Sequence, residues 1–397
     1  MSWSTVRADQ FCTLITDGTH DSPKPQQSGW KLITSKHLKG HYIDFDSANW
    51  ISEADYLKVI SRSAVEQWDI LFSMIGTIGN IYLEKNPHVE YACKNMGIFK
   101  FSGNKENALW MYYYLKSPQA KAYIQTHLRG STQAYVPLGG LREMPVPVPP
   151  QSVRNEIIAV LRPIDEKIEC NNAINDNLQQ QAAALFESWF VNYDPWDGVQ
   201  PSEWENAPLG SFVEIKRGGS PRPIQDFLSD SGLRWLKISD VTSLSSPFVL
   251  EIKEHIKEEG LRKTVFLHAG ELVLSNSATP GIPKILDVDT CIHDGWLYFP
   301  KSELSKYYLY LFFKHIRKEL VALGNGSVFT NLKTDILKAF PATKADESTL
   351  KEFDALVTPL FDAMLNADRE NFKLAAMRDA LLPKLMSSEI DVSEVEL

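Results

Sequence analysis

The sequence lacks the motifs that usually identify an enzyme, a metal protein or a membrane protein. Its 397 residues include four cysteines, none in a CxxC pair, and nine histidines, none in an HExxH motif. A disulfide framework and a metal site are therefore not expected. There is no GxxxxGK(S/T) phosphate loop and no GxSxG elbow. No run of eighteen apolar residues is present, so no membrane span is predicted. The first residues lack a basic segment followed by an apolar one, so no secretory signal is predicted and the cytoplasm is the expected location.

Net charge is −9 for the whole chain, but it is unevenly distributed. Residues 1–143 and 206–341 each carry +2, whereas residues 144–205 carry −7 and residues 342–397 carry −6. With 44% hydrophobic residues, the chain can bury more than one core. Mildly basic globular parts can bind phosphate if their cations share one face, and acidic segments suit protein contacts better than DNA.

An internal repeat organises the chain. At a constant offset of 196 residues, GSTQAYVPLGGLREMPVPVPP (130–150) is followed by GSVFTNLKTDILKAFPATKA (326–345). The shared positions include prolines and asparagines, and SPKP (22–25) corresponds to SPRP (220–223) with a small shift. The paired residues are Gly130 with Gly326, Ser131 with Ser327, Pro145 with Pro341, Pro163 with Pro359, and Asn175 with Asn371. The chain is therefore two copies of one unit, each a globular part followed by a helical part.

A heptad seam runs through both helical parts, with apolar positions alternating by four and three. Pro163 and Pro359 predict a short helix followed by a long one of about 27 residues, roughly 40 Å. Asn175 and Asn371 are expected to hydrogen-bond to each other near the middle of an antiparallel pair, although two unrelated helices packing on their own domains would give a similar pattern. The seam positions that we expect to pair the helices and to dock partners are Ile157, Leu161, Ile164, Ile168, Asn175, Leu178, Leu185, Phe353, Leu360, Met364, Asn371, Leu374 and Leu381. The same seam also contains Asn171, Ala182, Trp189, Val357, Ala367, Arg378 and Leu385.

The globular copies predict mixed α/β domains. Short β-like runs at 80–84, 212–218 and 270–276 accompany one strong helical run in each copy, at 108–128 and 303–320. Polar loops and cations recur at matching places and have the donors to reach phosphates and base edges. The candidate DNA contacts are Lys24, Lys36, Thr77, Arg129, Ser131 and Gln133 in the first copy, and Arg222, Lys237, Asn276, Lys284, Asn325, Ser327 and Lys333 in the second. Each residue taken alone also suits a solvated surface.

Two short stretches partly match motifs of enzymes that act on DNA. Glu251 to Lys253 has the acidic-x-Lys spacing of some nucleases, but it lies in an exposed charge run. NYDPW at 192–196 is similar to the box with which amino-methyltransferases hold a flipped base, yet it has one proline and no accompanying cofactor loop. We interpret these stretches as solvated surface and as a helix end followed by a turn, so no catalytic residue is expected.

LFESWFVNYDPW at 185–196 and LLPKLMSSEI at 381–390 resemble the phrases that close the helical regions of type I restriction-modification specificity subunits. The resemblance covers the whole chain and departs at Ser388, where glycine is usual. It implies an α+β fold: two mixed α/β target-recognition domains separated by two long helices forming an antiparallel coiled coil with pseudo-two-fold symmetry. The implied limits are 1–148 and 206–343 for the recognition domains and 149–205 and 344–397 for the helical spacers.

The resemblance also implies function and partners. The chain would read a bipartite, asymmetric site in double-stranded DNA in the cytoplasm of a bacterium or archaeon. Two methyltransferase subunits would dock on the helices and methylate adenine N6, and restriction-translocase subunits would join them. S-adenosylmethionine, ATP and Mg²⁺ are expected on those partners, with no cofactor in this chain. The alternatives are a single-chain DNA methyltransferase or nuclease, which S-adenosylmethionine binding would support, and a protein-binding coiled-coil scaffold, which would bind no DNA at any salt concentration.

Overall fold

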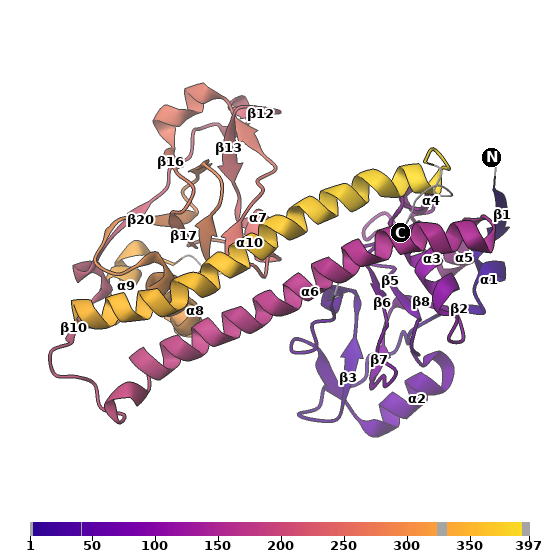
Figure 1. The fold of residues 1–397 in the computed structure, drawn as a ribbon, viewed down its shortest axis with the longest axis horizontal. Coiled ribbons are helices and arrows are strands. Elements are labelled where there is room, and N and C mark those ends of the chain that lie inside the picture. The colour runs from indigo at the N-terminus through magenta and orange to yellow at the C-terminus, as the bar shows by residue number, and fades with distance from the viewer. Residues whose placement is uncertain (1–2, 41, 324–331, 391–397) are drawn as a thin grey trace. The chain divides into compact units, whose positions relative to one another are not determined.

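The structure, a computed structural model, describes residues 3–40, 42–323 and 332–390 (Figure 1). The chain divides into two compact units, Met1–Glu169 with Leu374–Leu397 and Cys170–Lys373. This division by contacts cuts through both long helices, whereas the limits expected from the sequence separate globular from helical parts. Those sequence-based limits stay predictions.

The first globular copy contains three sheets. A two-stranded sheet joins β1 to β9, a four-stranded sheet has the order β2-β8-β5-β6, and a three-stranded sheet has the order β4-β3-β7 with β3 parallel to β7. The elements are β1 Ser4–Arg7, α1 Ala8–Phe11, β2 Leu14–Asp17, β3 Trp30–Ile33, η1 Ser35–His37, β4 Asn49–Ile51, α2 Glu53–Ser63, β5 Ile70–Ser73, β6 Ile81–Leu83, β7 Tyr91–Cys93, β8 Met96–Lys100, α3 Lys105–Lys116, α4 Pro118–Thr126, α5 Leu138–Glu143 and β9 Pro145–Val148.

The second copy keeps these strand orders and extends the two larger sheets with the edge strands β14, β12 and β16. Its sheets are β10-β21, β11-β20-β17-β18-β14 and β12-β15-β13-β19-β16, and β13 is again parallel to β19. The elements are η2 Asp194–Trp196, β10 Glu205–Pro208, η3 Leu209–Ser211, β11 Val213–Arg217, η4 Ile224–Asp226, β12 Leu228–Ser229, β13 Leu233–Leu236, α7 Ile238–Thr242, β14 Phe248–Val249, β15 His255–Ile256, η5 Glu258–Lys263, β16 Val265–Leu267, β17 Leu272–Ser275, β18 Pro283–Leu286, β19 Thr290–Ile292, β20 Trp296–Ser302, α8 Lys306–Leu323, α9 Thr334–Ala339 and β21 Pro341–Lys344. The mixed α/β prediction is confirmed for both copies.

One predicted helix is divided in two. The run 108–128 forms α3 and α4, because Ser117 between them is extended and its hydroxyl accepts a hydrogen bond from the backbone N–H of Ala120. Pro118 then occupies the first turn of α4, where its missing N–H costs nothing. The corresponding α8 has no such break and runs through Leu323.

The two long helices are α6, Gln151–Phe190, and α10, Glu347–Met386, each continuous over 40 residues. Their length is therefore about 60 Å at 1.5 Å per residue, and the expected break at the prolines is wrong. Pro163 and Pro359 are both exposed. On the exposed side of the helix, water can donate a hydrogen bond to the carbonyl that each proline ring displaces, while the opposite side of the helix keeps its apolar contacts.

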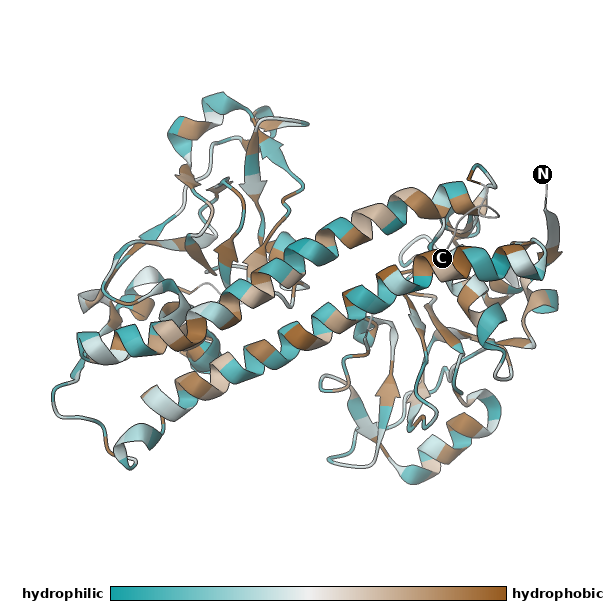
Figure 2. Cartoon of the chain, viewed as in Figure 1, coloured by the Kyte–Doolittle hydropathy of each residue, from teal (hydrophilic) through white to brown (hydrophobic). Residues whose placement is uncertain are grey.

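The seam positions form the buried side of both helices. All twenty are buried or half-buried, and Figure 2 shows hydrophobic and hydrophilic bands alternating along both helices. Within the second unit, Asn171 contacts Asn371 while Asn175 contacts Asp368. Within the first unit, Leu382, Leu385 and Met386 share a core with Ile157, Ile158 and Leu161. As the residue numbers rise along α6, the numbers of the contacting residues on α10 fall. The two helices are therefore antiparallel, which confirms the prediction.

The predicted bond between Asn175 and Asn371 is wrong. Asn371 accepts a hydrogen bond from Asn171 Nδ2 (2.9 Å) and donates to Asn172 Oδ1 (2.9 Å), whereas Asn175 Nδ2 donates to Asp368 Oδ1 (2.8 Å). In this register, a residue of α6 would face its own repeat counterpart on α10 only at a position between 171 and 175. Asn175 and Asn371 are therefore displaced from each other by about one helical turn. Polar side chains still fix the register of the seam.

Just after α10 lies Ser388, the position at which the segment 381–390 differs from the sequence usual in specificity subunits. Ser388 has a φ of +60°, the left-handed conformation that glycine adopts with least strain. The serine therefore keeps the turn that glycine usually makes there. Among the described residues, no helix combines the length and apolar character needed to cross a bilayer.

Candidate functional site

In the first unit, several loops meet at one edge of the sheets because of the strand directions. Asp17 at the end of β2 lies opposite Gly97 at the start of β8, and Ser73 at the end of β5 lies opposite Met96. Ile33 at the end of β3 lies beside Cys93 at the end of β7. The loops after β2, β3 and β5 therefore emerge together, beside the turn between β7 and β8. We call this the loop edge of the first unit.

The loop edge gathers all six candidate residues of the first copy. Lys24 follows β2, Lys36 lies on η1 after β3, and Thr77 lies in the turn after β5. Val136 N–H donates to the carbonyl of Met74, which brings the loop 129–135 to the end of β5. Arg129 and Tyr135 exchange two backbone hydrogen bonds of 2.9 Å, so Ser131 and Gln133 lie on the closed loop between them. All six side chains are exposed.

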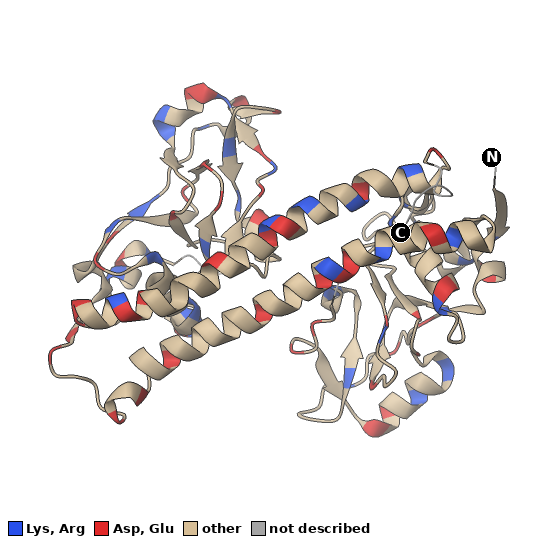
Figure 3. Cartoon of the chain, viewed as in Figure 1, with Lys and Arg blue, Asp and Glu red and all other residues tan. Residues whose placement is uncertain are grey.

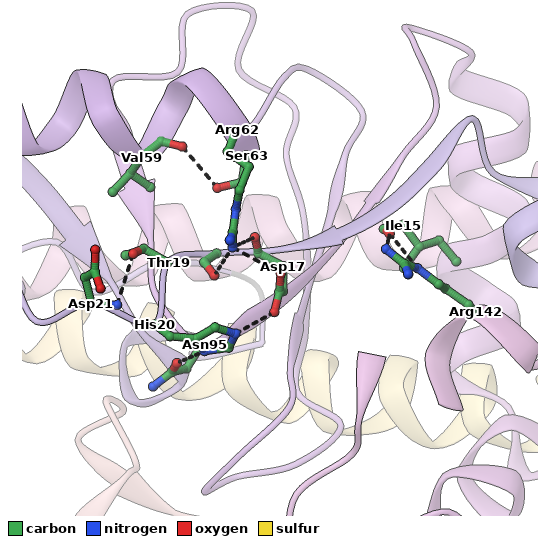
Figure 4. A network of polar contacts seen from close by, with 11 residues as sticks. Ile15, Asp17, Thr19, His20, Asp21, Val59, Arg62, Ser63, Asn95 and Arg142 are labelled. Carbon is green, nitrogen blue, oxygen red and sulfur yellow. Dashed lines mark hydrogen bonds and ion pairs between the residues drawn. The ribbon is translucent and has the colours of Figure 1, made fainter. Parts of the chain in front are cut away.

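A polar network fixes the loop after β2 (Figure 4). Arg62 of α2 donates to the carbonyl of Gly18 (3.0 Å) and to Asp17 Oδ1 (3.2 Å). His20 contacts Asp17 Oδ2 through Nε2 (2.8 Å) and Asn95 Oδ1 through Nδ1 (2.8 Å). Gly18 is needed here, because a Cβ atom would lie 2.3 Å from the carbonyl oxygen of Cys93. The loop that carries Lys24 is thus held against the turn between β7 and β8.

The second unit has a loop edge built in the same way. Arg217 at the end of β11 lies opposite Leu297 near the start of β20, Ser275 at the end of β17 lies opposite Trp296, and Leu236 at the end of β13 lies beside Ile292. Gly218 repeats the close approach seen at Gly18, since its Cβ would lie 2.3 Å from a carbonyl oxygen, that of His293. Arg222, Lys237 and Lys333 lie at this edge.

Asp294 organises the second loop edge. Its Oδ1 accepts from Ser220 Oγ (2.7 Å), its Oδ2 accepts from Arg222 (3.2 Å), and its carbonyl accepts from Arg217 Nε. The hydrogen bond from Ser220, followed by the charges of Arg217 and Arg222, lowers the pKa of Asp294 below its ordinary value. The carboxylate therefore stays charged and holds Arg222, whose side chain remains 80% exposed.

Two candidates of the second copy do not reach the surface. Asn276 is 3% exposed; its N–H donates to the carbonyl of Gly295 and its own carbonyl accepts from Leu332 N–H. Lys284 is also 3% exposed, because it lies on β18 with its amine donating to the carbonyls of Leu244 (2.7 Å) and Ser246. Both predictions of DNA contact are therefore wrong: Asn276 joins three segments beneath the loop edge, and Lys284 belongs to the interior.

The remaining candidates differ in their partners. Lys24, Lys36, Arg129 and Lys333 make no ion pair among the described residues, so their charges are available to an anion. Lys237, by contrast, is half-buried and paired with Glu254. Asn325 and Ser327 lie outside the described residues.

The residues that hold these loops in place are not among those predicted from the sequence. Arg62, Asn95 and Asp294 are separated from their partners by 45, 75 and 72 or more positions. Neither their spacing nor their residue type distinguishes them in the sequence. The one usable signal was Arg217, which directly precedes the loop containing SPRP.

Burial of Lys284 predicts an unusual alkaline response. Burial, and then Lys314 and Arg317 on α8, lowers the pKa of Lys284 to about 7, with Asp368 on α10 opposing them. A neutral amine still has two N–H groups for the two carbonyls. Because the unfolded chain binds the proton up to about pH 10.4, the free energy of unfolding should rise by up to about 1.4 kcal/mol per pH unit between pH 7 and 10.

Denaturant titrations at several pH values measure this slope. The Lys284→Met variant should have a flatter profile, while the exposed Lys351→Met variant should keep the wild-type slope. An equal slope in Lys284→Met and in wild type would mean that the amine keeps its proton in the folded chain.

The two loop edges indicate the class of protein to which the chain belongs. Each unit presents an edge of exposed cations and amides on short loops, held by a rigid scaffold, which suits binding to a polyanion. Within residues 3–40, 42–323 and 332–390, no three His, Cys, Asp or Glu side chains form a group that could hold a metal ion. The fold and site are those of a nucleic-acid recognition protein with two recognition domains.

Comparison with known proteins identifies the family. The family model of the type I restriction modification DNA specificity domain matches residues 3–180 and 201–343. The chain belongs to this family and is a non-catalytic DNA-recognition subunit. It is 24% identical over 387 residues to the specificity subunit of the type I restriction enzyme MjaIX of Methanocaldococcus jannaschii, covering 91% of this chain and 87% of that protein. It is 22% identical over 417 residues to the HindI specificity subunit of Haemophilus influenzae, covering 86% and 90%.

A solved structure agrees with the fold. The S subunit of a type I restriction-modification system from M. genitalium superposes with a TM-score of 0.57 at 14% identity, covering 97% of this chain and 96% of that one. At this identity the likeness extends to the fold alone. It supports a fold that combines mixed α/β domains with two long helices.

Proposed function

We propose that the chain reads a bipartite, asymmetric sequence in double-stranded DNA, with one loop edge on each half-site. The observation that supports this most directly is that the same edge is built twice with different side chains. Lys24, His20 and Asn95 line the first edge, whereas Arg217, Arg222 and Asp294 line the second. A conserved scaffold with exchanged contact residues suits the reading of two different sequences.

The two antiparallel helices serve as the spacer in this proposal. Each is about 60 Å long, which exceeds the roughly 34 Å of one DNA turn. Polar contacts at Asn171, Asn175 and Asn371 hold the register of the pair, so its length is set. The gap between half-sites would then be a property of the helices and not of the reading domains.

Other chains perform the chemistry in this proposal. Two methyltransferase subunits dock on the helical parts and methylate adenine N6, and restriction-translocase subunits join the assembly. S-adenosylmethionine, ATP and Mg²⁺ belong to those partners. The C-terminal part of α6 carries no lysine or arginine after Lys167 (Figure 3), which disfavours DNA and leaves that surface to proteins.

A salt titration of DNA affinity tests the DNA-binding part of this proposal. The full chain, co-expressed with its methyltransferase subunit, is titrated with a duplex bearing the methylated motif found by sequencing the host's methylome. Affinity should fall steeply as salt increases, because bound phosphates release counterions. Absence of DNA binding at every salt concentration would favour a protein scaffold, and S-adenosylmethionine binding by the isolated chain would favour a single-chain enzyme.

Arg222 and Lys24 are expected to behave differently in the same assay. Lys24→Ala should weaken binding to all sequences and reduce the salt slope by about one, as expected for a phosphate contact. Arg222→Ala should cost about 1–3 kcal/mol and relax specificity at one half-site, because Asp294 orients that arginine for a base edge. Lys351→Ala on α10 is the control for loss of a surface charge, and affinities equal to wild type in both test variants would remove these loops from the contact surface.

A further inference from the structure

The second unit contains an open pocket between α6, α8 and α10. Its volume is about 500 Å³. Ala182 of α6, Tyr310 of α8 and Phe361 of α10 form its apolar lining. Lys314 lies at its rim on α8, and Asp176 and Glu187 lie on the α6 side. Nothing in the proposed DNA contacts uses this space.

The internal repeat identifies the same place in the first unit. Trp110 Nε1 donates to the carbonyl of Pro147 (2.8 Å), and the Tyr308 hydroxyl donates to the carbonyl of Thr343 (2.7 Å). Pro147 and Thr343 are repeat counterparts in β9 and β21, 196 residues apart, so Trp110 corresponds to Tyr308. Six residues further along each helix, Lys116 corresponds to Lys314. On the long helices, the offset of 196 pairs two further sets, Asp165 with Phe361 and Ala182 with Arg378.

The first unit fills this place with its own side chains. Asp165 accepts from Lys116 Nζ (3.2 Å) and from Arg378 (2.8 Å), and all three side chains are largely buried. Lys116 also lies 4.2 Å from the ring centroid of Tyr112, the counterpart of Tyr310. The space between the helices is therefore occupied by a long side chain, and the lysine has a carboxylate.

The second unit has lost both of these partners. Phe361 stands in place of Asp165, and Ala182 stands in place of Arg378, which removes the carboxylate and the long side chain together. Lys314 makes no ion pair among the described residues. What remains is an open pocket of about 500 Å³ with a cation at its rim.

We propose that this pocket receives a carboxylate-bearing side chain from a docked partner protein, with its stem on Phe361 and Tyr310 and its carboxylate on Lys314. The aromatic lining suits a hydrocarbon stem, and Lys314, the one lysine or arginine among the described lining residues, suits a single negative charge. A phosphate dianion would fit poorly, because Asp176 and Glu187 lie on the opposite side. The occupant is a segment of a methyltransferase subunit, so the inference rests on the proposed function. Because described side chains of the first unit fill the corresponding place, the two ends of the chain bind their partners with unequal strength.

Two variants test this proposal in the complex with the co-expressed methyltransferase subunit. Ala182→Arg supplies the side chain that Arg378 provides in the first unit and fills the pocket. Lys314→Glu reverses the charge at the rim. The matched controls are Ala184→Arg, on the exposed side of the same helix, and Lys318→Glu, on the exposed surface of α8. Native mass spectrometry gives the stoichiometry, and titration of the methyltransferase subunit gives the affinity of each binding step.

We expect each test variant to weaken one of the two binding steps by about tenfold or more, and each control to change it by less than about twofold. Equal affinity in wild type, Ala182→Arg and Lys314→Glu would overturn the pocket assignment while leaving the proposed function intact. If wild type bound no methyltransferase subunit, the proposed function itself would fail. Thermal unfolding checks each fold, and Lys314→Glu decides alone if Ala182→Arg does not fold. Loss of self-association in place of methyltransferase binding would identify a second copy of the chain as the occupant and also overturn the proposal.

Discussion

Replacing Asp165 with alanine should lower the free energy of unfolding of the first unit by about 3–5 kcal/mol, because it leaves Lys116 buried without a carboxylate and leaves Arg378 paired with Asp379 alone among the described residues. Burial by itself would raise the pKa of Asp165, but these two cations lower it below its ordinary value, so the carboxylate is charged at neutral pH. Burial also lowers the pKa of Lys116 to about 8 against the opposing effect of Asp165. Without that carboxylate, the lysine would lose its proton more readily still.

Denaturant unfolding of the full chain measures this loss, and the adjacent residue provides the control. Glu166 pairs with Arg162 at 2.9 Å one helical turn away, with both side chains about half exposed. Glu166→Ala should therefore cost about 0.5 kcal/mol or less. Similar losses in Asp165→Ala and Glu166→Ala would mean that the buried cluster does not join α10 to the first unit.

Lengthening both long helices by one turn should change the recognised DNA and not the stability of either unit. Four residues inserted after Glu169 and four after Lys373 fall at the limits of the compact units. The contacts of Asn171 with Asn371, and of Asp165 with Arg378, then stay within their own units. The added turn is about 6 Å, so the gap between half-sites should grow by about two base pairs at roughly 3.4 Å each.

Methylome sequencing of cells that carry the lengthened chain reads this gap directly. Four residues inserted after Gly198, in the loop that follows η2, serve as the control and should leave the gap unchanged. An insertion after Glu169 alone should instead mismatch the two helices and destabilise the chain. If the double insertion kept the original gap, the helices would not set the spacing.

The sequence predicted much of the fold, because the internal repeat and the spacing of apolar residues depend on the local geometry of single helices and strands. The alternation of apolar positions by four and three correctly indicated one buried face on each long helix, since such faces follow from helical geometry alone. Duplication of the loops correctly indicated two similar mixed α/β domains. The prolines misled, because a proline on the solvent side of a well-packed helix costs only one hydrogen bond, and the sequence did not show which side would face water.

The candidate site was predicted unevenly. Loops that follow strands could be recognised, and Lys24, Arg129 and Arg222 are exposed at the loop edges as expected. Lys284 could not be distinguished from them, because a lysine beside a turn and a lysine inside a sheet look alike in one sequence. Asp294 carried no signal at all, since its role depends on meeting Ser220 and Arg222 across 72 or more residues.

The sequence alone determined that this chain is a duplicated α+β recognition protein with two amphipathic helices, because periodicity and repetition are properties of local order. Only the tertiary structure decided the exact register of those helices, the burial of Lys284 and Asn276, and the contrast between the filled cluster at Asp165 and the open pocket at Phe361. Each of these depends on which side chains meet across the fold, and the free energy of burying a charge or filling a cavity is set by those neighbours.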